Sequence, residues 1–165
     1  CGTGRTMLVP KHYGTQHYVG LDQSEASLQF AKKVSLEDGV EQFVPLKASL
    51  FDMPFENEYF DLVVSWGVLH CTPDPVKGIR EMMRVCKPGG RIIFLNHLVN
   101  GNKVLAFFER LVSPACEKIG FRTDLALHHI VGGMPVTVRS EERVKPLRMW
   151  YLVECVNDKL LATAH

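Results

Sequence analysis

Short apolar runs alternate with an amphipathic stretch in the first third of the chain. His17–Leu21 is rich in residues that favour β-strands, and Ser24 then precedes a stretch whose apolar positions recur at helical spacing up to Leu36. The apolar run Phe43–Leu46 predicts a second strand, and Pro45 favours a strand start or a sheet edge. This strand–helix–strand order is typical of parallel strands joined by a crossover helix.

The same alternation continues through the middle of the chain. Phe60–Ser65 is a compact apolar run that predicts a strand. Asp74 and Pro75 then have the pattern of a helix N-cap followed by a first-turn proline, and they predict a helix through about Cys86. We expect Lys87–Gly90 to end this helix and to turn into a further strand over residues 91–95.

The last part of the chain has a different pattern. A helix is predicted from Val104 to about Ile119, where Gly120 ends it. Two strand-like runs follow, Thr137–Val144 and Met149–Val156, and only four residues join them. Such a short link suits an antiparallel hairpin, since a parallel crossover needs about a dozen residues or more. The elements together predict an α/β fold with an open, mostly parallel sheet and a C-terminal hairpin.

Composition and charge narrow the class of protein. The chain has 165 residues, 46% of them hydrophobic and 22% charged, which is the balance of one ordinary globular domain. A net charge of +1 argues against a nucleic-acid partner. No apolar run approaches the roughly 20 residues needed to span a bilayer. The five cysteines are scattered, which is typical of free thiols in a reducing compartment and favours an intracellular protein.

Two polar features of the first strand–helix unit are candidates for ligand binding. Gly2 and Gly4 allow the backbone to pass close to a ligand, but the third glycine of a dinucleotide fingerprint is replaced by Met7, which argues against a nicotinamide cofactor. Asp22 ends the first apolar run, where a carboxylate can accept both hydroxyls of a ribose. The alternative is that Asp22 and Ser24 only begin a helix.

Three further segments follow the glycine loop and Asp22 in an order that would rarely arise by chance. Met53–Phe55, Phe60–Asp61 and Val85–Gly90 follow the glycine loop and the acidic strand end in a sequence that resembles the class I methyltransferases of the type 11 domain family. The resemblance covers about residues 1–95. It implies a Rossmann-like sheet with helices on both faces, whose first strand would precede Cys1 and is missing from this chain. It also implies one methyltransferase domain over residues 1–165, with a cofactor-binding half (1–95) and a substrate-side half (96–165).

The family resemblance implies a cofactor, S-adenosyl-L-methionine, which leaves as S-adenosyl-L-homocysteine, and a role for each matched residue. Gly2 and Gly4 would pass beneath the methionine part, and Asp22 would hold the ribose with Gln23 beside it. Ser49 stands where relatives usually have aspartate, which puts the adenine contact in doubt. The remaining cofactor-binding residues implied are Ser49 and Leu50 beside the adenine, and Ser65, Gly67 and His70 around the methionine end.

The second half of the chain is similar to the soluble phosphatidylethanolamine N-methyltransferases and, less closely, to membrane-associated thiol methylases and quinone C-methyltransferases. The segments that carry this similarity are Leu95–His97, Phe108–Pro114, Gly120–Asp124, Arg143–Leu147 and Trp150–Val156. It implies a small-molecule or lipid substrate. His97, at the end of its strand, is the candidate catalytic base, and the alternative is that it only satisfies a loop carbonyl. His128 and His129 lack partners for a metal, so no metal site is predicted.

A phospholipid substrate would require peripheral contact with a membrane. Phe107, Phe108, Leu111 and Val112 are candidates for an interfacial face, and core packing is the alternative. The expected location is intracellular, cytoplasmic or peripheral to a membrane, and a mitochondrial one is also compatible. An inactive cofactor-binding module remains an alternative, motivated by Ser49, and the sequence does not indicate the oligomeric state.

Overall fold

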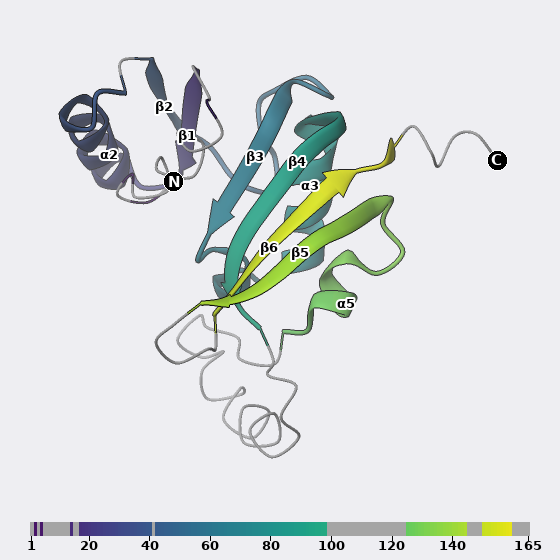
Figure 1. Ribbon diagram of the computed structural model, residues 1–165. Helices are drawn as coiled ribbons and strands as arrows, with labels where there is room; N and C mark the ends of the chain where they lie inside the picture. Colours follow the sequence, from purple (N-terminus) through teal and green to yellow (C-terminus); the bar gives the residue numbers. More distant parts are fainter. Residues whose placement is uncertain are drawn as a thin grey trace. The chain divides into compact units, whose positions relative to one another are not determined.

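The computed structural model describes residues 2, 4, 14, 17–40, 42–98, 125–144 and 150–159 (Figure 1). The chain divides into two compact units, Cys1–Glu56 and Asn57–His165. Each unit contains its own sheet, with two strands in the first and four in the second.

The first unit is a strand–helix–strand unit. Strands β1 (Tyr18–Asp22) and β2 (Phe43–Lys47) pair in parallel, from Tyr18 opposite Phe43 to Asp22 opposite Lys47. Helix α2 (Glu25–Glu37) connects them and lies against this sheet (Figure 1). The predicted strands and helix are therefore confirmed, and the parallel pairing brings the ends of β1 and β2 to the same edge.

Helix α2 forms where its sequence provides a cap and an apolar stripe. The Ser24 hydroxyl accepts a hydrogen bond from the Ser27 N–H (3.3 Å), which satisfies one of the free amides of the first turn. Ala31 lies on the face of the helix that is buried against Val40 and Phe43, with Val34 packed beside them. This small core holds the helix on the two strands.

The second unit is built on a sheet with the strand order β3-β4-β6-β5. Strands β3 (Phe60–Trp66) and β4 (Cys86–His97) are parallel, whereas β6 (Trp150–Asn157) pairs antiparallel with both β4 and β5 (Val136–Val144). The predicted C-terminal antiparallel hairpin is confirmed. The four residues predicted to link its strands lie outside the described residues, as does the helix predicted over 104–119.

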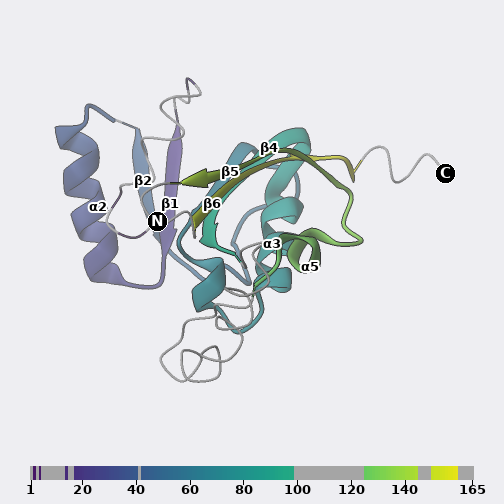
Figure 2. The ribbon, with the colours of Figure 1, turned by 60° about the horizontal axis from the view of Figure 1, so that its bottom comes forward.

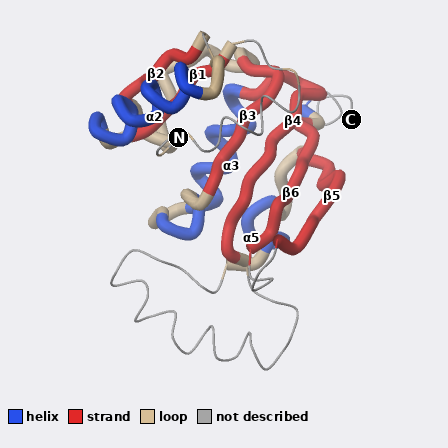
Figure 3. Tube along the Cα trace, turned by 60° about the vertical axis from the view of Figure 1, so that its left-hand side comes forward, coloured by secondary structure: helices blue, strands red, loops and turns tan. Residues whose placement is uncertain are grey.

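Helices α3 (Pro75–Val85) and α5 (Leu127–Val131) pack together on one face of the four-stranded sheet, as the turned views show (Figures 2 and 3). The Asp74 carboxylate caps α3 by accepting from the Lys77 N–H (2.9 Å), as predicted. The buried core of this unit is made of long aliphatic and aromatic side chains: Leu69, Ile79, Met82, Val85, Ile92, Ile93, Phe94, Ile130 and Val153.

The segment Lys87–Gly90 differs from its prediction, because the structure includes it in β4. The helix ends at Val85, but Cys86 already pairs with Phe60, and pairing resumes with Arg91 opposite Leu62. The four residues form an irregularity in the pairing with β3. Gly89 has a φ of +73°, and a Cβ on Gly90 would lie only 2.7 Å from the Cys86 Sγ. The two glycines therefore serve this tight bend within the strand.

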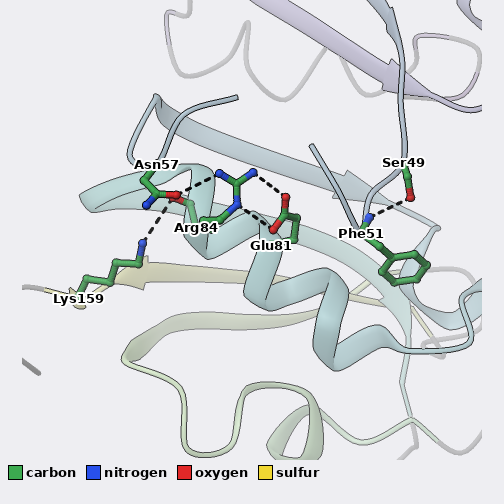
Figure 4. A network of polar contacts seen from close by, with 6 residues as sticks. All are labelled: Ser49, Phe51, Asn57, Glu81, Arg84 and Lys159. Carbon is green, nitrogen blue, oxygen red and sulfur yellow. Dashed lines mark hydrogen bonds and ion pairs between the residues drawn. The ribbon is translucent and has the colours of Figure 1, made fainter. Parts of the chain in front are cut away.

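Polar contacts connect the C-terminal end of α3 to the segments around it. Arg84 donates to both Glu81 carboxylate oxygens (2.9 and 2.7 Å) and to Asn57 Oδ1 (3.1 Å), as Figure 4 shows. Asn157, which is fully buried, donates through Nδ2 to the carbonyls of Met83, Cys86 and Lys87 at 2.8–3.3 Å. These bonds satisfy carbonyls at the end of α3 that lack helical partners.

The described ranges contain neither a membrane-spanning helix nor a disulfide bond. None of the helices there is both long and apolar enough to cross a membrane. The thiols of Cys71, Cys86 and Cys155 are free, and burial raises the pKa of both Cys86 and Cys155 to about 11. Such protonated, buried thiols pack as small apolar groups.

Candidate functional site

The glycines near the start of the chain have backbone conformations that other residues rarely adopt. Gly2 has a φ of +54° and Gly4 a φ of +86°, and Gly4 is buried. A side chain at either position would be strained in this left-handed region. The sequence prediction that the chain turns sharply here is therefore supported by the two residues that the structure describes.

Asp22 lies at the end of β1 and is bonded to the glycine loop. The Gly2 N–H donates to Asp22 Oδ2 (2.7 Å), and the Ser24 N–H donates to Asp22 Oδ1 (2.9 Å). Partial burial alone would raise the pKa of this carboxyl, but the hydrogen bonds from Ser24 and Gly2 lower it, and the net pKa lies below the ordinary 3.8. Asp22 is therefore an anion at neutral pH, which is the form that accepts hydrogen bonds from hydroxyl groups.

The remaining candidates of the first unit lie at the same edge of its sheet. Gln23 is exposed next to Asp22, and the Ala48 N–H donates to the Asp22 carbonyl (3.2 Å). Ser49 and Leu50 follow directly and are half-buried. The Ser49 hydroxyl accepts from the Phe51 N–H (3.1 Å), so it stabilises its own turn (Figure 4). In this contact the Ser49 oxygen accepts a hydrogen bond, so the hydroxyl can still donate its hydrogen to a ligand.

In the second unit, Ser65 and Gly67 lie at the carboxyl end of β3. Ser65 is buried, and its Oγ has no hydrogen-bond partner among the described residues. The chain turns after Trp66 through Gly67, whose φ is +66° and whose N–H donates to the Leu95 carbonyl (2.7 Å). A Cβ on Gly67 would lie 3.8 Å from the Trp150 ring. Gly67 thus combines a left-handed turn with close contact to β6.

His70 belongs to a buried group of polar and aromatic side chains in the same unit. It lies in the short 3-10 helix η2 (Leu69–Cys71) and is 2% exposed. Asn96 Oδ1 is 3.0 Å from His70 Nδ1 and accepts from the Leu69 N–H (3.1 Å). The Trp150 ring meets the imidazole edge-on, with centroids 5.1 Å apart. Burial lowers the pKa of His70, and the bond to Asn96 opposes this effect without cancelling it.

His97, the candidate base, is the last residue of β4 and is 3% exposed. Its pKa is lowered by burial and then by the charge of His70. Both imidazoles are therefore neutral at physiological pH, which is the form of a base. The structure brings His97, His70, Gly67 and Ser65 to the carboxyl ends of the parallel strands β3 and β4, where open α/β sheets bind ligands.

Sequence reasoning did not single out Asn96 or Trp150 as members of this group. Asn96 is fully buried, and its Nδ2 has no hydrogen-bond partner in the part of the chain that the structure describes. A signal was present, because the amide of Asn96 directly follows the apolar run Ile92–Leu95. Trp150 carried no such signal, because its contact with His70 depends on how β6 pairs with β4.

No metal site is found within the described ranges, where no group of three or more potential ligands lies together. The rings of the exposed pair His128 and His129 on α5 lie 4.1 Å apart between centroids with their planes tilted by 56°, and no third ligand joins them there. The candidate chemistry is therefore carried by one carboxylate with its glycine loop in the first unit, and by buried imidazoles and amides in the second.

The sequence is similar to a methyltransferase family model and to several methyltransferases. The family model described as a methyltransferase domain matches residues 1–94. A phosphatidylethanolamine N-methyltransferase from Cereibacter sphaeroides is 25% identical over 146 residues, which are 88% of this chain and 72% of that protein. A demethylmenaquinone methyltransferase from Lactococcus lactis subsp. lactis is 36% identical over 95 residues, which are 56% of this chain and 38% of that protein.

The fold itself is shared with solved methyltransferase structures. A geranyl diphosphate methyltransferase in complex with S-adenosylmethionine superposes with a TM-score of 0.73 at 13% identity, over 95% of this chain and 75% of that one. The predicted Rossmann-like α/β fold is therefore confirmed, and it is that of a class I methyltransferase. With the family model matching more than half of its length, the chain belongs to the methyltransferase domain family.

Proposed function

We propose that this chain transfers a methyl group from S-adenosyl-L-methionine to the amine of a phospholipid head group similar to phosphatidylethanolamine. Membership of the family supports the methyl transfer. The observation that carries the substrate class is the similarity to the Cereibacter phosphatidylethanolamine N-methyltransferase, which extends over 88% of the chain and so includes the second half. The match to the Lactococcus demethylmenaquinone methyltransferase covers 56% of the chain, so it carries less information about the acceptor.

The residues of the first unit fit a nucleoside cofactor. Gly2 and Gly4 carry no side chains that could block a ligand, and Asp22 is an anion whose Oδ2 accepts a hydrogen bond from the Gly2 N–H. Asp22 would accept from the ribose hydroxyls, Gln23 would lie next to it, and Ser49 with Leu50 would flank the adenine. Each charge-assisted hydrogen bond of this kind contributes about 1.5–3 kcal/mol to binding.

The second unit contains buried polar atoms that a ligand could bond to. Ser65 Oγ and Asn96 Nδ2 are buried polar atoms with no partner among the described residues, and such atoms are costly unless a ligand or water bonds to them. We expect Ser65, Gly67 and His70 to line the methionine end. When bound, the cofactor supplies a methyl group on a positively charged sulfur, which needs little further activation.

The protein's contribution is then to position the acceptor and to manage its proton. An amine attacks only as the neutral base, with its lone pair directed at the methyl carbon. The buried, neutral imidazoles of His70 and His97 are groups that accept a proton at physiological pH. A lipid acceptor also requires peripheral contact with a membrane surface; the segment predicted to make it, residues 107–112, lies outside the described residues.

The experiment is methyl transfer by the full protein chain from radiolabelled S-adenosylmethionine to extracted lipid. We expect label in vesicles that contain phosphatidylethanolamine. We expect none in vesicles of phosphatidylcholine alone, because the head-group nitrogen of that lipid is quaternary and cannot accept a further methyl group. A demethylmenaquinone and a small thiol are tested in parallel. Label in the quinone or the thiol, with none in phosphatidylethanolamine, would contradict the lipid assignment, and no label in any acceptor would support an inactive cofactor-binding module.

A further inference from the structure

The amide of Asn96 has only one orientation that is consistent with its contacts. Its side chain faces the Leu69 backbone N–H at 3.1 Å and His70 Nδ1 at 3.0 Å through the same atom. A backbone N–H only donates, so the atom that it faces must be the amide oxygen and not the nitrogen. The contact with Leu69 therefore settles which end of the Asn96 amide lies against His70.

The orientation of Asn96 determines which nitrogen of His70 carries the proton. Because Asn96 Oδ1 only accepts, His70 Nδ1 must be the donor of the bond between them. A neutral imidazole has a single N–H, so Nε2 then presents its lone pair. The neutral ring predominates at physiological pH, because burial lowers its pKa below the ordinary value of 6.5.

Aromatic and backbone contacts fix the direction of the ring. The Trp150 indole packs edge-on against it, with an interplanar angle of 85°. The place that a Cβ would occupy on Gly67 lies 4.0 Å from His70 Cε1 and 3.8 Å from Trp150. The imidazole is thus held by an amide from β4, an indole from β6 and the turn after β3, at the carboxyl end of the two parallel strands.

We propose that His70 is the proton acceptor for the amine of the methyl acceptor, and that Asn96 is the positioning residue that holds His70 as the Nδ1–H tautomer. This inference rests on the proposed function. The substrate ammonium group would give one proton to His70 Nε2 and keep the electron pair of the broken N–H bond. The ring becomes an imidazolium with a hydrogen on each nitrogen, and the amine keeps the lone pair that methyl transfer requires. The proton then passes from Nε2 to water.

Several groups influence the protonation of His70. His97 on β4 interacts with it by charge, so the two rings oppose each other's protonation. Cys71 follows His70 in η2, and burial raises the pKa of its thiol, which keeps it neutral. From β6 the ring meets the uncharged indole of Trp150. The neutral amide of Asn96 can be replaced by a carboxylate of the same shape, which gives a direct way to change the basicity of His70.

The first test is independent of activity and uses NMR of the full protein chain labelled with ¹⁵N-histidine. We expect the His70 signals, assigned by their loss in His70→Asn, to show hydrogen on Nδ1 and none on Nε2 above neutral pH. Asn96→Asp should keep this tautomer and raise the pH at which the ring takes its second proton, because a carboxylate stabilises the imidazolium. Asn96→Leu should remove the preference for one tautomer. Hydrogen on Nε2 in the unchanged protein would overturn the proposal.

The second test is the rate of methyl transfer to phosphatidylethanolamine. His70→Asn keeps an amide close to where Nδ1 stands but removes Nε2, and we expect kcat to fall at least about 100-fold with little change in KM. In Asn96→Asp the acid limb of the kcat–pH profile should move to higher pH, whereas a purely structural role would leave that limb in place. His128→Asn on the exposed surface of α5 is the matched control and should keep full activity.

The outcomes separate the two proposals. Full kcat in His70→Asn, or a large loss in His97→Asn alone, would assign the proton to His97 and overturn the role of His70. If the unchanged protein methylates no amine, the proposed function fails, whereas the tautomer measured by NMR still tests the geometry of Asn96 and His70.

Discussion

The two units of the chain prepare their polar groups in opposite ways. In the first unit, the Asp22 carboxylate is partly exposed and is held by backbone N–H groups of Gly2 and Ser24. In the second unit, His70 and Asn96 are almost completely buried and are held mainly by each other and by Trp150. The difference shows two routes to a defined protonation state: hydrogen bonds keep Asp22 charged, and burial keeps His70 neutral.

The hydrophobic cores of the two units also differ in how deeply they are buried. The cluster Ala31, Val40 and Phe43 of the first unit leaves its phenylalanine 9% exposed, whereas the largest fully buried side chains of the described residues, such as Phe94, lie in the second unit. A carboxylate held by backbone amides depends on the local conformation of the loop. A buried imidazole depends on the packing of its whole unit. We therefore expect core substitutions to affect the second unit most strongly.

The largest effect is expected from Phe94→Ala in the centre of β4. Phe94 is 0% exposed, and removal of a buried phenylalanine side chain costs about 3–5 kcal/mol of unfolding free energy. Both tryptophans of the chain, Trp66 and Trp150, lie in the second unit, so urea unfolding followed by tryptophan fluorescence reports on it. Val138→Ala, an exposed position on β5 in the same unit, is the control, with an expected change within about 0.5 kcal/mol. Equal losses in the two variants would contradict the comparison.

A smaller effect is expected on ligand binding when Asp22 is changed to alanine. Loss of charge-assisted hydrogen bonds to the ribose should weaken binding of S-adenosylhomocysteine by about 2 kcal/mol, measured by calorimetry of the full protein chain. Glu25→Ala is the matched control, because this exposed carboxylate, three residues further on, accepts a hydrogen bond from Gln29 Nε2 (2.9 Å) one turn along α2. Unchanged affinity in Asp22→Ala would remove Asp22 from the binding site.

His70 and Asp22 should contribute to the unfolding free energy over different pH ranges. The folded pKa of His70 lies below 6.5, so its contribution to stability is complete above pH 6.5 and is lost as the pH falls through the folded value. The folded pKa of Asp22 lies below 3.8, so its contribution is lost only in stronger acid. Unfolding free energies between about pH 7 and pH 5 should therefore vary less in His70→Asn than in the unchanged chain. A similar flattening in Asp22→Asn would contradict the assignment.

Much of the fold could be predicted from the sequence, because its signals are local. The caps Ser24 and Asp74 and the alternation of apolar runs placed α2, α3 and the strands around them within about a residue of the structure. The segment Lys87–Gly90 was assigned to a turn outside the strand, because two glycines signal a break. In the structure the chain bends there and the pairing of β4 with β3 resumes at Arg91, which depends on a neighbouring strand and not on local sequence.

The candidate site also has parts with a local sequence signal and parts that depend on long-range contacts. The contact of Gly2 with Asp22 follows from a loop and a strand end that the sequence marks clearly, and the structure places their atoms 2.7 Å apart. The bond between His70 and Asn96 joins residues 26 positions apart, and the packing of Trp150 on His70 depends on the antiparallel pairing of β6 with β4. Such long-range contacts have no local signature. The sequence therefore indicated His70 and His97, but not the contacts of Asn96 and Trp150 with His70.

The most direct test of the central claim is calorimetric titration of the full protein chain with S-adenosylhomocysteine and, separately, with NAD. The anionic Asp22 beside a loop of two left-handed glycines, together with membership of the methyltransferase domain family, predicts saturable one-site binding of S-adenosylhomocysteine and no binding of NAD. Binding of NAD in place of S-adenosylhomocysteine, or of neither, would contradict the account.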